Sequence, residues 1–186
     1  MDTFNFLSVL FSVIVGLALT DVLQGFRKLI HARQRVIIFW PMLIWGAVMI
    51  LILVQTWWGM FAMRNFAHWT FAMYGAVIGQ ITLMYLAAGV TMPEVPEEGP
   101  AHMEAAYFAN KDWFFGLLAA TVLATFLKDF ILVGHVIGGA NFVFLFTYLV
   151  FAVIAVAVKS RWYHLALAPV AAAGVLANAA LMSYRL

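Results

Sequence analysis

Long apolar runs separated by short polar segments fill this chain of 186 residues. Six of the runs reach the roughly 17–25 residues that an α-helix needs to cross a bilayer. They cover, approximately, residues 4–26, 36–58, 69–90, 113–133, 140–158 and 163–184. The runs are continuous and lack the period-two alternation of barrel strands. The pattern therefore predicts an all-α fold, a polytopic transmembrane bundle of six helices, as a single transmembrane domain over residues 1–186.

The longest polar segment, residues 91–112, is predicted to be the loop between the third and fourth spans. We expect its second half, residues 102–110, to form a short helix on the membrane surface. Asp112 is then the expected N-cap of the fourth span. The loop leaves three spans on each side, and aligning the first span with the fourth places Asp21 opposite Asp129. Repeats of three helices are related by inversion, so two inverted three-helix halves are one architecture that this alignment suggests.

Lys and Arg residues are unevenly divided between the two ends of the predicted bundle. The connections after the first, third and fifth spans carry seven of them, and the opposite end carries three. Because cytoplasmic loops are enriched in Lys and Arg, we expect these connections in the cytoplasm and both termini outside. The densest cluster follows the first span. It is a candidate contact for lipid headgroups through Arg27, Lys28, Arg33 and Arg35.

Composition removes several alternatives. Hydrophobic residues make up 66% of the chain and charged residues 10%, whereas soluble proteins average about 45–50% and about 25%. A soluble fold of this size cannot bury so much apolar surface, so the lipid bilayer is the expected partner. The net charge is only +2 and no basic stripe lies outside the membrane-flanking loops, so we expect no nucleic-acid binding. The absence of cysteine excludes disulfides, thiol catalysis and iron–sulfur ligation.

Asp21 is an ionisable group inside an apolar run, where a charge is costly and usually faces protein or water. The basic cluster that follows places this carboxylate near the inner end of the first span. One interpretation makes Asp21 an ion or proton ligand at the inner mouth of a pathway. The other makes it a hydrated interfacial carboxylate, neutralised by Lys28 or by Lys159.

Lys128 and Asp129 form a second charged group, near the outer end of the fourth span. Neighbouring residues on a helix point about 100° apart, so we expect no direct pairing between them and an outward, snorkelling Lys128. The amides of Gln80 and Asn178 lie near the middle of the membrane. An amide at that depth needs a partner across a helix interface, so these two residues are either pathway contacts or interhelical hydrogen bonds.

Tryptophans at the predicted helix ends form an aromatic belt at the membrane surface, which includes Trp57 and Trp58. Gln55 stands beside this pair and is a candidate contact for a lipid or quinone headgroup, although the belt alone also explains the segment. The five histidines show no metal-ligand spacing, and no catalytic motif is present. We therefore expect no metal, no cofactor, no catalytic residue and no enzymatic activity.

Four stretches carry a resemblance to known proteins: "FLSVLFSVIVGLALTDVLQG" at residues 6–25, "RQRVIIFWPMLIW" at 33–45, "VQTWW" at 54–58 and "KDWFFGLL" at 111–118. In these stretches the chain resembles an uncharacterised family of small bacterial six-helix inner-membrane proteins. The resemblance spans roughly the first two-thirds of the chain. It implies a multi-pass protein of the bacterial inner (plasma) membrane, and it carries over no catalytic or binding residue.

Three functions follow from these features. The first is an oligomeric channel or transporter for an ion, proton or small solute, with Asp21, Lys128, Asp129, Gln80 and Asn178 as candidate contacts. The second is a non-transporting accessory or scaffold subunit of a larger membrane complex, which binds lipid, quinone or pigment in its grooves. The third is a lipid-modifying enzyme. Its candidate residues are Asp21, His31, Glu104 and His164.

Overall fold

The computed structural model describes residues 3–66, 68–96, 99–136 and 138–183. In chain order its elements are α1 (Thr3–His31), β1 (Val36–Ile37), α2 (Trp40–Met60), the 3-10 helix η1 (Phe61–Asn65), α3 (Phe71–Thr91), β2 (Ala101–His102), α4 (Met103–Val133), α5 (Ala140–Ala157) and α6 (Arg161–Ser183). Within the described residues, six helices are long and apolar enough to cross a membrane. The predicted all-α six-helix bundle is therefore confirmed. The predicted end of the sixth span and Arg185 lie outside the described residues.

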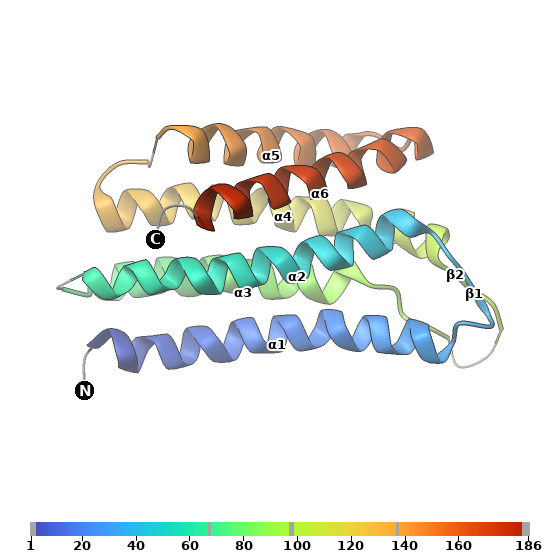
Figure 1. The fold of residues 1–186 in the computed structure, drawn as a ribbon, viewed down its shortest axis with the longest axis horizontal. Helices are drawn as coiled ribbons and strands as arrows, with labels where there is room; N and C mark the ends of the chain where they lie inside the picture. Colours follow the sequence, from blue (N-terminus) through green and yellow to red (C-terminus); the bar gives the residue numbers. More distant parts are fainter. Residues whose placement is uncertain (1–2, 67, 97–98, 137, 184–186) are drawn as a thin grey trace.

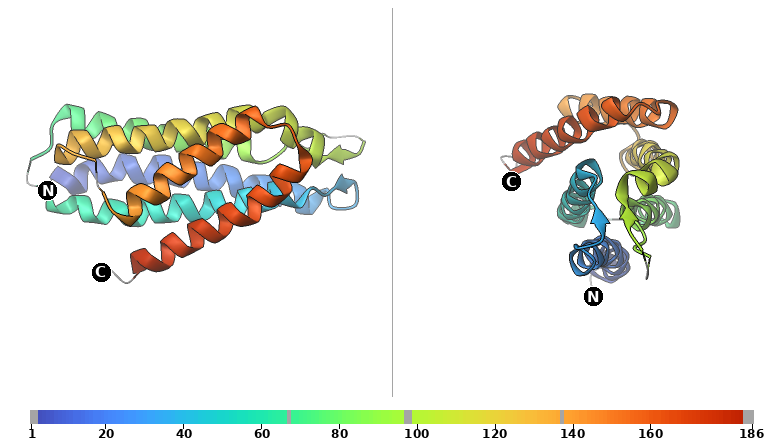
Figure 2. Two further views of the ribbon diagram at one scale, coloured as in Figure 1. Left: turned by 90° about the horizontal axis from the view of Figure 1, so that it is seen from above. Right: turned by 90° about the vertical axis from the view of Figure 1, so that its right-hand side faces the viewer.

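The helices run lengthwise beside one another, and the start of α1 and the end of α6 lie toward the same end of the bundle (Figure 1). We call this the terminal end. The opposite end holds the connections from α1 to α2, from α3 to α4 and from α5 to α6, and we call it the basic end. Helices α5 and α6 lie across one side of the other four, and α6 slopes from the level of α5 toward α2 (Figures 1 and 2). Large apolar side chains stay exposed on the outward faces, which suits a lipid surrounding.

Two helices are longer than the apolar runs predicted. Helix α1 continues to His31, because Arg and Lys end the stretch that fits hydrocarbon but favour the last turns of a helix, where they oppose its macrodipole. Helix α4 begins at Met103 and is continuous. The predicted surface helix and fourth span are therefore one helix, and Asp112 lies inside it rather than at its N-cap. Neither Gly nor Pro occurs between residues 103 and 115, so nothing in the sequence breaks the helix there.

The two three-helix halves pack differently. Helix α3 packs along both α1 and α4, and α4 packs along α5. In the first half the outer helices α1 and α3 are in close contact, whereas α6 makes its main contact with α2 rather than with α4. The packing therefore gives no support to inverted halves, which stay a prediction.

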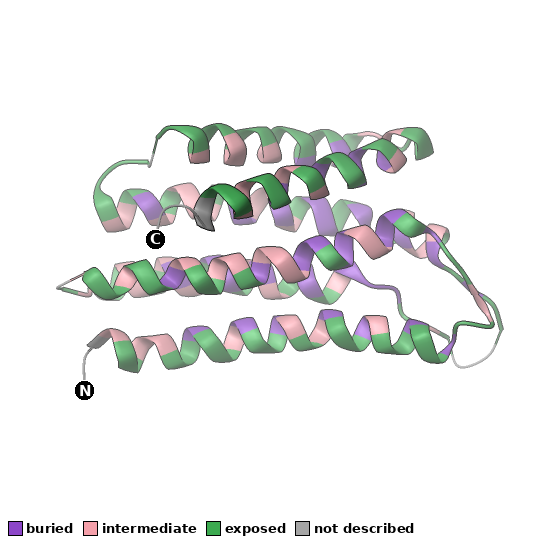
Figure 3. Ribbon diagram, viewed as in Figure 1, coloured by how far each residue is buried: buried purple, intermediate pink, exposed green. Residues whose placement is uncertain are grey.

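Buried residues are more frequent toward the basic end of the bundle (Figure 3). Several aromatic side chains pack against one another there. Trp45 packs edge-on against Phe114 and Phe115, with ring centroids 5.3 and 5.2 Å away. Tyr107 packs edge-on against His164 with centroids 5.4 Å apart. We use "aromatic cluster" for these five residues. Rings that interlock in this way leave little free volume, so the bundle is densely packed at this end.

Met92 and β2, from the connection between α3 and α4, lie close to the end of α1 and the start of α2. The two-residue strands β1 and β2 pair in parallel, and the Ala101 amide donates to the Arg35 carbonyl at 2.9 Å. Met92 lies so close to α1 that a Cβ atom added at Gly25 would stand 2.5 Å from the Met92 Cβ. This is below any normal contact distance, and the atom it meets is close to the backbone. Gly25 is therefore required by the approach of this segment.

Replacing Gly25 with alanine is expected to destabilise the protein, although alanine is the better helix former. The clash with Met92 costs about 1–3 kcal/mol, which outweighs the gain in helix propensity of about 0.8–1 kcal/mol. Gly16→Ala on the same helix is the matched control, because an added Cβ there meets nothing within 4 Å. Thermal unfolding followed by tryptophan fluorescence should show opposite shifts for the two variants. Equal shifts would contradict the close contact at Gly25.

Candidate functional site

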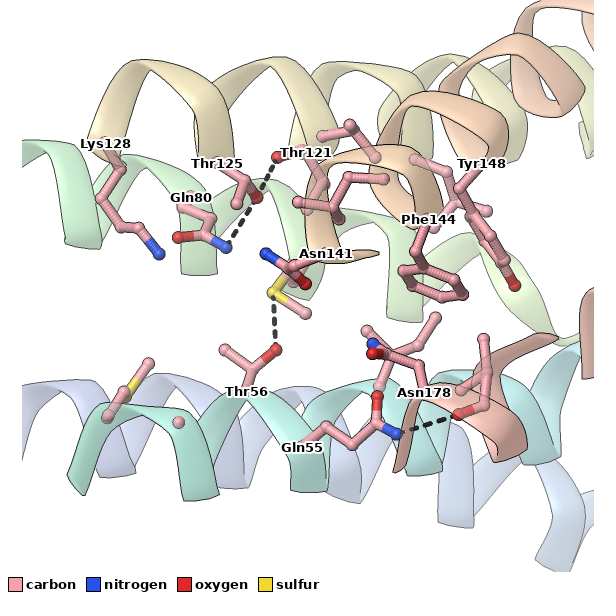
Figure 4. Close-up of a pocket in the computed structure, with 18 of the residues that line it drawn as sticks. Gln55, Thr56, Gln80, Thr121, Thr125, Lys128, Asn141, Phe144, Tyr148 and Asn178 are labelled. Atoms are coloured by element: carbon pink, nitrogen blue, oxygen red, sulfur yellow. Dashed lines mark hydrogen bonds between the residues drawn. The ribbon is translucent and has the colours of Figure 1, made fainter. Parts of the chain in front are cut away.

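A cavity of about 230 Å³ lies between α2, α3, α4, α5 and α6, in the half of the bundle nearer the terminal end. We call it the central cavity. Its walls combine aliphatic and aromatic side chains with polar groups from all five helices (Figure 4). The polar residues that line it are Gln55, Thr56, Gln80, Thr121, Thr125, Lys128, Asn141, Tyr148 and Asn178. This convergence makes it the strongest candidate site in the described part of the chain.

A second hollow, of about 550 Å³, adjoins the central cavity on the side of the terminal end. We call it the side crevice. It lies between α2 with η1 and α5 with α6, and its wall includes Trp58, Phe61, Arg64 and Leu181. Gly59, Asn141, Phe144 and Asn178 line both spaces. The two hollows are therefore adjacent, and these four residues separate them.

The opposite end of the central cavity is closed. Leu118 and Tyr148 of its wall also border a void of about 10 Å³ that is bounded by Trp45 and Phe115 of the aromatic cluster. Such a void is about the size of a single water site. Toward the basic end the central cavity thus ends at packed aromatic rings, and toward the terminal end it adjoins the side crevice.

Lys128 does not snorkel outward, and its predicted independence from Asp129 is wrong. Only 13% of the Lys128 side chain is exposed, and its Nζ atom lies 3.5 Å from Oδ1 of the buried Asp129. The ammonium group points into the central cavity (Figure 4). Adjacent residues of a helix leave its backbone about 100° apart. The four methylene groups of Lys128 nevertheless let its ammonium group bend toward the Asp129 carboxylate.

Gln80 bridges two helices. Its Nε2 atom donates to Oγ1 of Thr125 at 2.9 Å, and the Thr125 hydroxyl donates in turn to the Thr121 carbonyl at 2.9 Å. The structure therefore gives this amide the interhelical partner that its depth requires. Gln80 also lines the central cavity, so the pathway interpretation and the interhelical interpretation coexist at this residue.

Gln55 faces the interior rather than the headgroups. Its Nε2 atom donates to the Val175 carbonyl of α6 at 3.1 Å, and the side chain lines the central cavity. Trp57 and Trp58 are about half exposed, as a membrane belt requires. Gln55 precedes Trp57 by two residues, which turns it about 200° around the helix axis. Proximity in sequence therefore did not place Gln55 in the belt.

Asn141 of α5 and Asn178 of α6 both line the central cavity (Figure 4). Neither carboxamide makes a hydrogen bond to the residues that the structure describes. Asn178 was predicted from its depth, whereas Asn141 was missed because it stands at the very start of its apolar run. The Tyr148 hydroxyl in the same wall is buried and has no partner within the described part of the chain.

Asp21 does not belong to this site. It is half-buried on α1, a helix that contributes no wall to the central cavity or the side crevice. No described Lys, Arg or His nitrogen lies within 4.0 Å of its carboxylate. The structure therefore separates Asp21 from Lys128 and Asp129. At the basic end, Arg27, Lys28 and Arg35 line a pocket of their own, and Arg33 is exposed outside it.

Two polar groups at the basic end were missed as structural anchors. Lys111 is 2% exposed and donates to the Ala155 and Val156 carbonyls of α5 at 3.3 and 2.8 Å, besides pairing with Asp112. His164 is fully buried between Tyr107 and the Val158 carbonyl. Lys111 was predicted to be a charged residue of the loop between the third and fourth spans. The unbroken helical stretch around it was the signal that it lies inside the bundle.

The polar side chains that converge on the central cavity are amides, hydroxyls and one ammonium group, which can bind a small molecule through hydrogen bonds. No group of three or more His, Asp or Glu side chains that could hold a metal ion occurs among the described residues. The candidate lipid-enzyme set is not gathered either: Glu104 pairs with Arg161 at 2.8 Å, and both ring nitrogens of His164 already have partners. Comparison of the chain with protein-family models, with curated proteins and with solved structures gave no match.

Proposed function

We propose that this chain is a membrane transport protein, a carrier for a small solute, and that the central cavity is its solute site. The observation that supports this most is a cavity that reaches from the middle of the bundle toward the terminal end and in which polar side chains from five helices converge. Solute sites of membrane carriers typically lie near the middle of the bilayer, at the interface between groups of helices. Homo-oligomerisation and the bacterial inner membrane are part of this proposal.

The closure toward the basic end supports a carrier rather than a channel. A channel needs a continuous path, whereas the aromatic cluster fills the bundle between the central cavity and the basic end. The excess of Lys and Arg at that end supports a cytoplasmic position for it. With this orientation both termini are outside, and the structure corresponds to a state open outward.

The walls indicate the kind of solute. Most of the surface of the central cavity is apolar, with Ile52, Val77 and Leu118 among its lining residues. The free carboxamides of Asn141 and Asn178 offer both donors and acceptors. The Lys128 ammonium adds a donor, although Asp129 partly neutralises its charge. We therefore expect a small amphipathic solute that carries a carbonyl or carboxylate group beside an apolar part.

Replacing Asn178 with phenylalanine is expected to abolish transport, because the larger ring fills the junction between the central cavity and the side crevice. The measurement is uptake of radiolabelled alanine, valine, lactate and benzoate into proteoliposomes. We expect saturable uptake of at least one of these probes by the unaltered protein. Leu176→Phe is the matched control, since Leu176 is an exposed residue of α6 that lines neither hollow.

Three outcomes would contradict the carrier. One is uptake of every probe at the rate of empty liposomes, and another is equal loss in both variants. The third is unchanged uptake by Asn178→Phe. A rate that rises without saturation would favour a channel instead.

The side crevice favours a second candidate function. It is larger than the central cavity, has mostly apolar walls and lies between helices whose outer faces are exposed. Such a crevice suits a lipid or quinone tail held by an accessory subunit of a larger complex. Purification in gentle detergent followed by mass analysis separates the two functions. A foreign subunit in fixed proportion supports the accessory role, and a homo-oligomer alone supports the carrier.

A further inference from the structure

A separate pocket of about 390 Å³ lies at the basic end, far from the central cavity along the bundle. We call it the basic pocket. Its lining residues are Arg27, Lys28, His31, Ala32, Arg35 and Val95. Three of the six are Arg or Lys, a fourth is a histidine, and none is a carboxylate. A concave surface with this lining is complementary to an anion.

The local fold builds this pocket from two segments. In the last turns of α1, His31 follows Lys28 by three residues and Arg27 by four, which makes it a neighbour of both on the helix surface. Val95 supplies the opposing wall from the segment that follows α3. A hydrogen bond holds this segment in place: Nη1 of Arg35 donates to the Pro96 carbonyl at 2.7 Å. Arg35 is thus engaged in holding the wall, and the ligand contacts fall to Arg27, Lys28 and His31.

The depth of the pocket matches the phosphate layer of a bilayer. Hydrocarbon about 30 Å thick takes up roughly 20 residues of helix. Counted from the start of α1 at Thr3, these residues end near Leu23, and Arg27 follows about 6 Å beyond at 1.5 Å per residue. The headgroup region adds about 5–7 Å on each side of the hydrocarbon. Arg27 and Lys28 therefore stand at the level of lipid phosphates.

The positive-inside rule explains why cations occur at this end, but it does not require them to line a hollow. Arg33 illustrates the difference. It belongs to the same cluster in the sequence, yet it is exposed outside the pocket and donates to the Ile30 carbonyl at 3.3 Å. Only some of the basic residues therefore line the pocket. A specific anion site would show this uneven distribution.

We propose that the basic pocket binds a phosphate group, and that its depth assigns this group to the headgroup of an anionic phospholipid. Arg27 and Lys28 contact the phosphate oxygens, and His31 adds a hydrogen bond. Basic pockets between transmembrane helices on the cytoplasmic side are a known means of holding anionic headgroups. This proposal does not rest on transport, because the basic pocket shares no residue with the central cavity.

The test uses the full chain in detergent micelles that contain equal amounts of phosphatidylcholine and phosphatidylglycerol. Native mass spectrometry counts the lipids that stay bound. We expect the unaltered protein to retain phosphatidylglycerol over phosphatidylcholine about tenfold or more, since each basic side chain near the surface contributes about a fivefold preference. The double variant Arg27→Gln/Lys28→Gln is expected to lose this preference. Because both residues are exposed, we expect the variant to fold.

The matched control is Arg33→Gln/Lys159→Gln, which removes two charges at the same end without touching the pocket. It should keep the preference for phosphatidylglycerol. Equal loss in the two double variants would overturn the pocket, because general surface charge would then explain binding. If the first double variant does not fold, His31→Ala alone is expected to reduce the preference, because alanine has no side-chain donor, and an unchanged preference would overturn the site.

A second arm separates lipid phosphate from free phosphate. The same protein in neutral micelles is titrated with inorganic phosphate and followed by calorimetry. No saturable heat supports the lipid assignment. Saturable binding that the Arg27→Gln/Lys28→Gln variant loses would overturn the lipid assignment in favour of a soluble phosphate ligand.

Discussion

Replacing Lys111 with methionine is expected to lower the free energy of unfolding by about 2–4 kcal/mol, since each buried polar group that loses its partner costs about 1–3 kcal/mol. The Lys111 ammonium reaches the Ala155 and Val156 carbonyls in the last turn of α5. Carbonyls in a last turn have no amide partner inside their helix, and a cation there also opposes the helix macrodipole. Methionine fills a similar volume, so the loss is polar rather than a cavity effect.

The measurement is thermal unfolding of the purified chain, followed by tryptophan fluorescence in detergent. Lys159→Met is the matched control, because Lys159 is exposed near the same end and the substitution removes the same charge. We expect little change for the control and partial recovery for Lys111→Arg, which keeps a cation and several donors. Equal unfolding temperatures for Lys111→Met and Lys159→Met would show that the carbonyls of α5 do not depend on Lys111.

The six helices could be predicted from the sequence because the length of an apolar run and the thickness of a bilayer fix each span independently. Their ends were less predictable. Hydropathy marks where hydrocarbon stops, whereas a helix stops where its backbone loses partners. Helix α1 therefore continues through Arg27 and Lys28, and α4 begins nine residues before Asp112. The absence of Gly and Pro between residues 103 and 115 was the better signal for where α4 begins.

The candidate site was predictable only in part. The need of Gln80 for an interhelical partner followed from its depth, but the identity of Thr125 depended on which helices became neighbours. Gln55 was assigned to the membrane surface by its sequence neighbours and faces α6 instead. Asn141 carried no distinguishing signal. Local pattern fixes how deep a residue lies, whereas rotation about the helix axis and helix order decide which residues meet.

The two ends of the molecule differ in how α5 and α6 are held. At the basic end, Lys111 and His164 tie the end of α5 and the start of α6 to α4 through buried hydrogen bonds. At the terminal end the same two helices border the side crevice. In the proposed carrier, the pair α5 and α6 is therefore anchored near the closed side of the cavity and less constrained near its open side.

Replacing His164 with leucine is expected to lower the free energy of unfolding by about 2–6 kcal/mol, because two buried polar groups lose their partner at about 1–3 kcal/mol each. Nε2 of His164 lies 2.9 Å from the Val158 carbonyl, and Nδ1 lies 2.9 Å from the Tyr107 hydroxyl. A carbonyl can only accept, so Nε2 carries the proton and Nδ1 accepts from Tyr107. His102→Leu is the matched control, since His102 is exposed at the same end.

A double-mutant cycle isolates the bond between Tyr107 and His164. Tyr107→Phe alone removes the hydroxyl and leaves Nδ1 of His164 without its donor, which we expect to cost about 1–3 kcal/mol. In the His164→Leu background the same change removes a hydroxyl that has already lost its acceptor, so it should cost nothing or stabilise. Equal costs of Tyr107→Phe in both backgrounds, measured by thermal unfolding, would show that the two side chains are energetically independent. A coupling of about 1 kcal/mol or more would establish that this buried pair fastens α6 to α4.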